Sequence, residues 1–367
     1  MINKRIIFFM PHMVGGGVEK NLYIIANNFA KKIKHVHLIT SRTNFNSNFK
    51  NVKIINPRLK IWNYFGASFN YLICLLILIK EVLSKKKPLV FAFQANVYCI
   101  IICKILNIKI VIRSNSSPSG WTQNNFKKYI FKKVFKKADK IIVNSLEFQK
   151  NFKKKFTVES ECIYNPLNKK EILKKSKIKI NLDFFKDNKK FKILNIGRFT
   201  DQKDHYTLLK SIKVLKNKYK LNFILLIMGR GENRSNIQNF INKNHLNPHV
   251  KVIGFKKNPY KYIRHCNLFV LSSRFEGLPN VLLEAITLKK FVISSNCPTG
   301  PSEILNNGKG GFLFKTGSSN DLAKKINYYY NNKKKLKKKI NFAYNNLDRF
   351  DLNTNLKKYL KVITDLF

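Results

Sequence analysis

Two glutamates, Glu276 and Glu284, lie eight residues apart in a chain that has 19 acidic residues. In their segment, SSRFEGLPNVLLEAITLKK (272–290), an apolar strand ends at Ser273 and Pro279 suits the first position of a helix. We therefore expect Glu276 on the loop and Glu284 on the helix, roughly 6 Å along its axis. Two acids at different depths suit two different hydrogen-bonding tasks. The plain alternative is a solvated helix residue and a first-turn acid favoured by the helix dipole.

The residues between the two glutamates could hold an anion. A helix that begins here leaves backbone N–H groups without helical partners, namely those of Asn280, Val281 and Leu282. With the helix dipole they would form an anion site suited to a diphosphate. Gly277 would let the backbone come close to a ligand.

Two cations follow another expected strand. In NIGRFTDQKDHYTLLKSI (195–212) the strand ends at Gly197, Arg198 comes next, and Lys203 lies at the mouth of the following helix. Together the two cations could clamp diphosphate oxygens. In so basic a chain either of them alone could be an ordinary solvated residue. The prediction therefore depends on their shared place at a strand end.

A triple glycine joins the first expected strand to the first expected helix, in MVGGGVEKNLYIIANNFA (13–30). It could let a phosphate or a sugar approach the backbone, and close packing explains it equally well. The dinucleotide fingerprint does not fit, because Lys20 stands where a third glycine or alanine belongs and GRGE (229–232) offers two glycines. A nicotinamide-dependent dehydrogenase is therefore disfavoured.

Length and composition favour two globular domains. The chain has 367 residues, more than one core of typical size holds, and 44% of them are hydrophobic. Its 71 basic residues give a formal charge of +52, which would attract nucleic acid, an anionic membrane surface or a phosphorylated substrate. Most of these residues are Lys, and Asn, Ile and Phe are also abundant, so AT-rich coding explains much of the excess equally well.

The six cysteines are scattered and lack the paired spacing of metal ligands. Most of them lie in apolar runs, as expected of reduced core thiols in the cytosol. We expect neither disulfides nor zinc. The cysteines are Cys74, Cys99, Cys103, Cys162, Cys266 and Cys297.

Short apolar runs alternate with longer helical patterns, which is typical of parallel sheets with crossover helices. The expected fold class is α/β, with two facing, doubly wound, Rossmann-like domains. The expected strands are 5–10, 35–40, 52–56, 89–94, 108–114, 140–145, 191–197, 222–229, 250–255, 268–273, 291–295 and 311–314. The expected helices are 18–32, 69–84, 96–106, 122–137, 146–153, 204–218 and 280–289.

The first domain is expected to span 1–167, followed by a polar, Lys-rich linker over 168–190 and a second domain over 191–345. The amphipathic end of the chain, about 352–367, could pack back on the first domain. Open α/β domains hold their ligands outside the carboxyl ends of the strands.

No leader or membrane span is expected. Residues 1–10 are expected to form a buried strand, because no small-residue cleavage site follows them. The most apolar run, 71–79, ends at Lys80 and Glu81, well short of the ~20 residues that a span needs. A buried or membrane-edge helix fits it better.

Together these segments resemble the retaining glycosyltransferases of family 4, which have two facing α/β domains (the GT-B architecture). The resemblance covers nearly the whole chain. The matching segments are GGGVEKNL, NIGRFTDQKDH, LIMGRGE, VIGF, FEGLPNVLLEA and NCPTGPSEILNNGKGGFLF. The most specific of them is EGLPNVLLEA, in which seven residues separate the two glutamates.

The resemblance implies a UDP-sugar donor and retention at the anomeric carbon. It places the donor diphosphate on Arg198 and Lys203, the ribose hydroxyls on Glu284, and the transferred sugar on Glu276. Glu276 would be the catalytic residue, either as a nucleophile or, as we favour, as a positioning group during attack on the same face. The other expected donor-binding residues are Gly277, Leu278, Asn280, Gly15, Gly16 and Gly17.

The resembled family works without a bound metal, and no Asp-x-Asp pair stands at an expected strand end of this chain. Cationic side chains and helix amides would then stabilise the leaving group. No metal and no cofactor are expected, with the UDP-sugar as substrate.

One departure concerns the first domain. Many family members carry a His near the end of the strand that here reads VIRSNSSPSG (111–120), where Arg113, Ser114 or Asn115 stands instead. His12 is a weak substitute. The loop NCPTGPSEIL resembles that of members that extend surface polysaccharides rich in amino sugars or galactose. An N-acetylhexosamine or hexose donor and a lipid-linked or polysaccharide acceptor of lipopolysaccharide, O-antigen or capsule synthesis are therefore expected.

The segment NNFKKYIFKKVFKKADK (124–140) has a basic amphipathic pattern, with an apolar side at Phe126, Ile130, Val134 and Phe135. Such a helix suits an anionic membrane surface, and a crossover helix with a solvated Lys face explains it too. The resemblance favours the membrane, with the protein peripheral on the inner, cytoplasmic face of the cytoplasmic membrane. The lysines are Lys127, Lys128, Lys132, Lys133, Lys136 and Lys137.

Two other kinds of protein remain as alternatives. A nucleotide-sugar epimerase of the same architecture would need no acceptor. A nucleic-acid-binding protein would use the +52 charge, but the aromatic residues follow buried strand patterns and no known binding module is present, so no nucleic-acid partner is expected. Dependence of nucleotide release on an acceptor separates a transferase from both.

Overall fold

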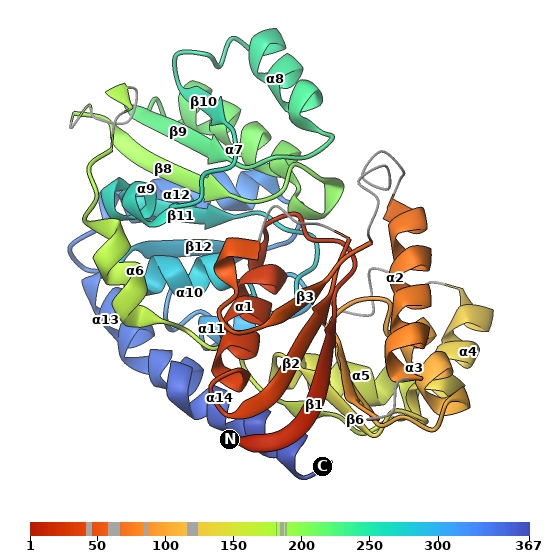
Figure 1. The fold of residues 1–367 in the computed structure, drawn as a ribbon. Helices are drawn as coiled ribbons and strands as arrows, with labels where there is room; N and C mark the ends of the chain where they lie inside the picture. Colours follow the sequence, from red (N-terminus) through yellow and green to blue (C-terminus); the bar gives the residue numbers. More distant parts are fainter. Residues whose placement is uncertain are drawn as a thin grey trace. The chain divides into compact units, whose positions relative to one another are not determined.

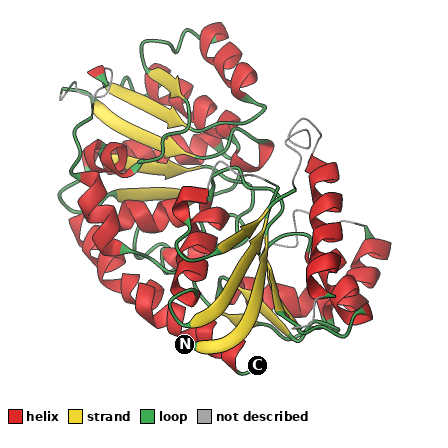
Figure 2. Cartoon of the chain, in the orientation of Figure 1, coloured by secondary structure: helices red, strands yellow, loops and turns green. Residues whose placement is uncertain are grey.

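The computed structural model describes residues 1–41, 46–57, 67–83, 87–115, 124–180, 182–183, 187 and 189–367. These residues divide into two compact units, Met1–Pro166 with Leu352–Phe367, and Leu167–Asp351. Each unit has a parallel sheet covered by helices (Figure 1, Figure 2).

The first unit has a sheet of order β3-β2-β1-β4-β5-β6-β7, in which every pair is parallel. Its strands are β1 Ile2–Phe9, β2 Ile33–Ile39, β3 Lys53–Ile55, β4 Leu89–Ala92, β5 Ile110–Arg113, β6 Lys140–Val143 and β7 Glu161–Cys162. Its helices are α1 Gly17–Phe29, η1 Asn46–Asn48, α2 Ala67–Val82, α3 Asn96–Ile105, α4 Asn125–Phe135, α5 Leu146–Phe156 and α14 Leu352–Thr364.

Helices cover both faces of this sheet because successive side chains of each strand point to opposite faces. On one face Phe8 of β1 belongs to a core with Leu22 of α1 and Tyr359 of α14. On the other face Ile7 of β1 belongs to a core with side chains of α2, α3, α4 and α5. The first unit is therefore doubly wound.

The second unit has a parallel sheet of order β10-β9-β8-β11-β12-β13. Its strands are β8 Phe191–Ile196, β9 Phe223–Met228, β10 Val250–Ile253, β11 Leu268–Leu271, β12 Phe291–Ser295 and β13 Phe312–Phe314. Its helices are α6 Lys169–Ser176, η5 Asp201–Lys203, α7 His205–Asn217, α8 Arg234–Lys243, α9 Tyr260–His265, α10 Asn280–Thr287, α11 Pro301–Ile304, α12 Ser319–Asn331, α13 Lys337–Asn345 and η6 Asn346–Phe350.

In both sheets the strand order reverses beside the first strand of the unit. The reversal lies between β1 and β4 in the first unit and between β8 and β11 in the second. At such a switch point the two neighbouring loops leave in opposite directions, which opens a place for a ligand beyond the carboxyl ends of the strands. In the second unit these two loops carry Lys203 and Glu276.

All twelve expected strands and all seven expected helices are present, with ends that differ by a few residues. The two-residue strand β7 was not expected. The first two residues of the expected helix 122–137 and the last residue of the expected helix 69–84 lie outside the described residues. So do residues 116–120 of the segment compared with the family His. The expectation of two Rossmann-like α/β domains is confirmed.

The stretch expected as a linker, 168–190, is helical over α6. The side chain of Asn168 caps this helix by accepting from the N–H of Glu171. Ile172 and Ser176 are the buried residues of the helix. Helix α6 packs against α9 and α10 within the second unit. That unit thus begins at Leu167 and extends to Asp351, where the sequence boundaries were 191 and 345.

None of the described helices is long and apolar enough to cross a membrane. All six cysteines are free thiols, and only Cys162 is partly exposed.

Candidate functional site in the second unit

The turn after β8 is held close to the end of β9. A Cβ on Gly229 would lie 1.8 Å from the carbonyl oxygen of Gly197, so only glycine fits there. The N–H of Phe199 donates to the carbonyl of Arg230 at 2.8 Å. This close approach sets the start of the turn that carries Arg198 and Lys203.

Lys203 contacts Glu276 directly. Its side chain runs past Gly197, where an added Cβ would lie 3.3 Å from Lys203 Cγ, and its Nζ forms an ion pair with Glu276 Oε1. The Ser272 hydroxyl donates to the carbonyl of Lys203 at 2.9 Å. The two side chains are mostly buried, at 14% and 8% exposure, so this pair is shielded from water.

Glu276 is fixed by its own loop as well. Its Oε1 accepts a hydrogen bond of 2.6 Å from the hydroxyl of Ser273. Its N–H donates to the carbonyl of Pro298 at 2.8 Å, and its carbonyl accepts from Thr299 Oγ1 at 3.1 Å. Both the carboxylate and the backbone of Glu276 are therefore held in place by the ends of β11 and β12.

Arg198 lies at the exposed edge of the same turn. Its Nη2 donates to Gln202 Oε1 at 3.1 Å. Gln202 in turn donates to the carbonyl of Phe275 at 2.9 Å and accepts from the N–H of Arg274 at 2.8 Å. Gln202 thus links the turn after β8 to the loop after β11.

Glu284 is buried in α10, which excludes the alternative of a solvated helix residue. Its neighbours Leu278 and Ala285 are buried too. Helix α10 begins without a side-chain cap, as an open anion site requires. The N–H of Leu282, one of the amides expected at the start of this helix, donates to the carbonyl of Pro279 at 3.1 Å.

The loop after β12 covers the Gly277 backbone. Gly300 has φ +90°, and a Cβ there would lie 2.1 Å from the carbonyl oxygen of Gly277. The same carbonyl accepts from Thr299 Oγ1 at 3.2 Å. The NCPTGPSEIL loop therefore supports the loop that carries Glu276, a structural task that the sequence did not indicate.

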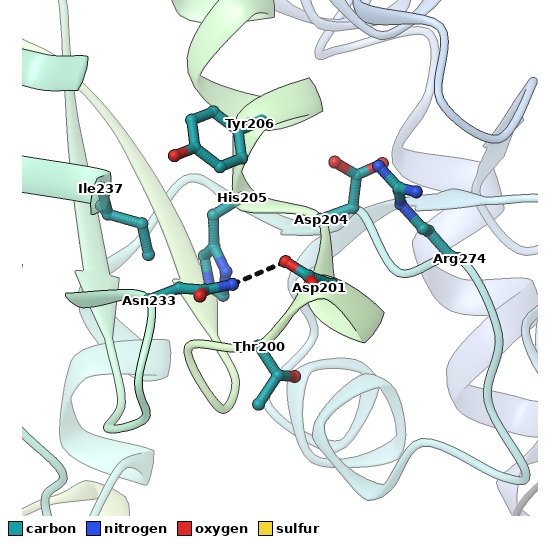
Figure 3. A pocket seen from close by; sticks show the side chains of 8 residues that line it. All are labelled: Thr200, Asp201, Asp204, His205, Tyr206, Asn233, Ile237 and Arg274. Atoms are coloured by element: carbon teal, nitrogen blue, oxygen red, sulfur yellow. Dashed lines mark hydrogen bonds and ion pairs between the residues drawn. The ribbon is translucent and has the colours of Figure 1, made fainter. Parts of the chain in front are cut away.

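Several residues that flank Lys203 in the sequence line a small pocket (Figure 3). Asn233 donates to Asp201 at 2.7 Å, and Arg274 pairs with Asp204 at 3.4 Å. Burial, with the nearby Lys203 charge, lowers the pKa of His205 from its usual value to about 4. The lining residues are Thr200, Asp201, Asp204, His205, Tyr206, Asn233, Ile237 and Arg274.

Cys297 lies near Glu276 but is not a nucleophile at neutral pH. Burial, with the Glu276 charge next in size, raises the pKa of this thiol to about 12. In the described part of the chain, no group of three or more His, Cys, Asp or Glu side chains could hold a metal ion.

The glycine turn belongs to the first unit, and the Glu19 side chain lies against it. The Glu19 carboxylate accepts from the N–H groups of Val14 and Gly16, both at 2.9 Å. Gly15 has φ +74°, which favours glycine. The turn of Gly15, Gly16 and Gly17 is therefore closed on Glu19, a residue that the sequence reading overlooked.

Arg113, which stands near the family His position, is fully buried. Its Nε donates to the Tyr359 hydroxyl at 2.9 Å, and its other nitrogens donate to Asn115 and Asn165. Arg113 is thus committed to the interior of the first unit. His12 is held through its backbone, which exchanges two hydrogen bonds with the Gln94 side chain.

The residues that sequence reasoning missed are mainly the supports of Glu276 and Lys203. Ser272 and Ser273 end the expected strand 268–273, and two adjacent hydroxyls there were a signal that could have been used. Gln202 and Thr299 gave no such signal, because their partners lie far away in the sequence.

The family model described as glycosyl transferases group 1 matches residues 176–346. This segment holds every site residue described above for the second unit. The second unit carries a group 1 glycosyltransferase domain.

Two curated relatives are similar to more than half of the chain. An uncharacterized glycosyltransferase of Methanocaldococcus jannaschii is 36% identical over 248 residues, 62% of this chain and 60% of the relative. The N-acetylgalactosamine-N,N'-diacetylbacillosaminyl-diphospho-undecaprenol 4-alpha-N-acetylgalactosaminyltransferase of Campylobacter jejuni is 30% identical over 222 residues, 58% of each chain. The chain therefore spans about three fifths of the length of these relatives.

The fold of the whole chain matches solved structures. That of Anabaena HepE in complex with UDP and glucose has a TM-score of 0.80 at 18% sequence identity, over 99% of this chain and 100% of the other. The likeness includes the glycosyltransferase domain and the first unit, and it confirms the fold.

Proposed function

We propose that the chain is a retaining glycosyltransferase that moves a hexose or N-acetylhexosamine from a UDP-sugar to a lipid-linked or polysaccharide acceptor in surface glycan synthesis. The observation that carries the proposal is the buried contact between Lys203 and Glu276 at the switch point of the second unit. In this contact the Lys203 ammonium, which could bind a diphosphate, lies next to the Glu276 carboxylate, which could bind a sugar hydroxyl. The group 1 domain and the relatives named above support this reading.

The donor would bind along the start of α10. Arg198 and Lys203 would take the diphosphate together with the amides of Gly277, Leu278 and Asn280, and the dipole of the uncapped helix would add to the attraction. Glu284, one turn into the helix, would accept from the ribose hydroxyls. On entry of the donor Lys203 would turn toward a phosphate oxygen, while Ser273 keeps its hydrogen bond to Glu276.

Glu276 would act as a positioning residue that accepts a hydrogen bond from a hydroxyl of the transferred sugar. Two donors already engage its Oε1, the Ser273 hydroxyl and the Lys203 ammonium, which makes this carboxylate a weak nucleophile. The leaving diphosphate would then take the proton of the attacking acceptor on the same face. The charge that develops on it would be stabilised by Lys203, Arg198 and the helix amides, with no metal in this role.

The acceptor side is proposed from the Campylobacter relative, whose name describes transfer to a saccharide on diphospho-undecaprenol. An acceptor on a lipid diphosphate would place this protein at the inner face of the cytoplasmic membrane. An anionic membrane surface would then be a partner alongside the donor and the acceptor. The glycine turn at Gly15–Gly17 would approach a ligand only if Glu19 gave up its two amides.

The test is UDP release by the purified full chain from a panel of UDP-sugars, with and without a lipid-linked oligosaccharide fraction. We expect release with one sugar and only with the acceptor, unchanged by a chelator. Glu276→Gln should lower turnover roughly a hundredfold or more, because the positioning charge is lost. Glu159→Gln, which alters an exposed ion pair in the first unit, is the matched control.

Each contrary result has a distinct meaning. Nucleotide release that needs no acceptor would favour the epimerase. No release with any pair would overturn the UDP-sugar assignment. Full activity of Glu276→Gln would remove Glu276 from the site, and loss of activity on chelation would contradict leaving-group stabilisation by cations and amides alone.

A further inference from the structure

Three neighbouring helices of the first unit turn apolar side chains to solvent. Helix α3 packs against both α2 and α4, and all three cover the same face of the sheet (Figure 1). A surface helix of a protein in water normally has an apolar side toward the core and a polar side toward solvent. Most of the solvent-facing side chains of helices α2 and α3 are apolar, with Ser68 and Lys80 as the polar exceptions on α2.

Helix α2 is apolar on both sides. Leu72 and Leu76, one turn apart, are 53% and 58% exposed, and Leu83 just beyond the helix is 66% exposed. Cys74 and Leu78 on the opposite side are fully buried. An all-round apolar helix is typical of a buried element, yet one side of α2 has no protein over it in the described part of the chain.

Helix α3 repeats the pattern. Tyr98, Ile101 and Ile105 follow each other at spacings of three and four residues and so form one exposed stripe. Ile105 is the most exposed, at 76%. The one charged residue of this helix, Lys104, is engaged by Asp139 at 2.7 Å.

The first turns of α4 add aromatic side chains and a dense set of lysines. Phe126, Tyr129 and Ile130 are exposed, and Lys133 Nζ lies 4.6 Å from the centre of the Tyr129 ring. In the sequence from 67 to 137, Glu81 is the only acid, and it is paired with Arg5. The charged rim of this surface is therefore mainly positive, because the nearest acids, Glu81 and Asp139, are paired with Arg5 and Lys104.

We infer that this surface docks on an anionic lipid bilayer. The membrane-facing patch consists of Leu72, Leu76, Leu83, Tyr98, Ile101, Ile105, Phe126, Tyr129 and Ile130. The patch would enter the boundary between headgroups and acyl chains, while the lysines of α4 bind the phosphates above it. Helix α2 has 16 residues, too few to cross a bilayer, and would lie along its surface.

Other occupants fit the patch less well. In a dimer formed through this patch, the α4 lysines of the two copies would repel each other, and each copy carries a charge of +52. A nucleic acid would match the lysines but would leave the leucines and isoleucines in water. An anionic bilayer matches the charge and covers the apolar side chains together.

This inference rests on the proposed function for its membrane setting, but the contact can be measured without any sugar transfer. The experiment is flotation of the full chain with vesicles of phosphatidylcholine alone or mixed with phosphatidylglycerol, at low and high salt. We expect at least about tenfold stronger binding to the anionic vesicles, weakened by salt.

Two variants test the two halves of the patch. Leu76→Asp with Ile105→Asp adds charge to the apolar part, and Lys127→Glu with Lys128→Glu reverses charge at the rim. Each should lower anionic-vesicle binding about tenfold or more, with an unchanged melting temperature because all four side chains are on the surface. The matched controls lie in the second unit, Ile178→Asp at a 54% exposed side chain and Lys334→Glu with Lys335→Glu.

Binding of both patch variants at the level of wild type would overturn the inference, as would an equal effect of the controls. A wild-type dimer that Leu76→Asp with Ile105→Asp dissociates would assign the patch to a second copy instead. The variants should bind UDP as wild type does. Flotation that succeeds while UDP release fails would reject the proposed function and keep the bilayer contact.

Discussion

At the residue scale, the site of the second unit depends on charges that are buried in pairs. Lys203 and Glu276 are 73 positions apart in the sequence, and each compensates the other in a place with little water. Removing one partner of such a pair leaves the other uncompensated, which costs more than the pair itself contributes. A loss of activity in a variant of either residue must therefore be separated from a loss of stability.

Glu284→Ala should weaken binding of UDP roughly tenfold to a hundredfold, the worth of a hydrogen bond to a charged group. The expected reason is the loss of the acceptor for the ribose hydroxyls. Calorimetric titration with UDP and 2'-deoxy-UDP measures this directly. Wild type should prefer UDP, and the variant should lose that preference. Equal preference for UDP in both proteins would remove Glu284 from the ribose site.

His205 should make the stability of the second unit depend on pH. Its pKa is about 4 in the folded chain and about 6.5 when unfolded, so the unfolded state binds more protons between these values. Stability should fall as the pH drops from about 6.5 toward 4, by up to roughly 3 kcal/mol. The free energy of unfolding, measured with denaturant at several pH values in this range, should change less steeply with pH in His205→Gln than in wild type. The exposed His265→Gln should behave as wild type does, and an unchanged slope in His205→Gln would contradict the assignment.

At the scale of elements, the site is built from the ends of strands. Short turns after β8, β9, β11 and β12 carry the supporting contacts, and their backbones approach so closely that side chains are excluded at Gly229 and Gly300. The GRGE segment (229–232), which does not fit the dinucleotide fingerprint, has a structural role in this close approach. Its first glycine lets β9 end against the turn that carries Lys203.

Gly229→Ala should destabilise the second unit by roughly 3 kcal/mol, because the added methyl meets the Gly197 carbonyl and one backbone must move. A thermal melt should shift down by roughly 5–10 °C. The matched control is Gly254→Ala, where the nearest atom to the new Cβ is Arg234 Nη1 at 3.9 Å. Equal melting of the two variants would show that the approach of β8 and β9 is not rigid.

At the scale of the whole molecule, distant parts of the chain meet inside the first unit. Helix α14 returns to pack beside α1, and its Tyr359 meets Arg113 of β5. The Tyr359 hydroxyl also donates to the carbonyl of Ile163 at 3.3 Å. The buried guanidinium of Arg113 thus links α14, strand β5 and Asn165, which lies just before the second unit begins.

Tyr359→Phe should destabilise the first unit by roughly 1.5–3 kcal/mol, because the fully buried Arg113 Nε loses its acceptor. Denaturant unfolding measures the loss. Tyr98→Phe, at an exposed side chain, should change little. A neutral Tyr359→Phe would mean that Arg113 finds another acceptor.

The sequence by itself determined what depends on neighbours along the chain. Periods of two and of about four residues indicated all the expected strands and helices, and the spacing of Glu276, Pro279 and Glu284 placed a loop and a helix correctly. It failed at α6, where a high Lys content hid a helix with one narrow apolar side.

The tertiary structure decided which side chains meet. It paired Lys203 with Glu276, closed the glycine turn on Glu19 and buried Arg113. It also showed that α2 and α3 keep apolar side chains in solvent. None of this follows from local periodicity, because burial and long-range pairing are set by how whole elements pack and not by the residues on either side.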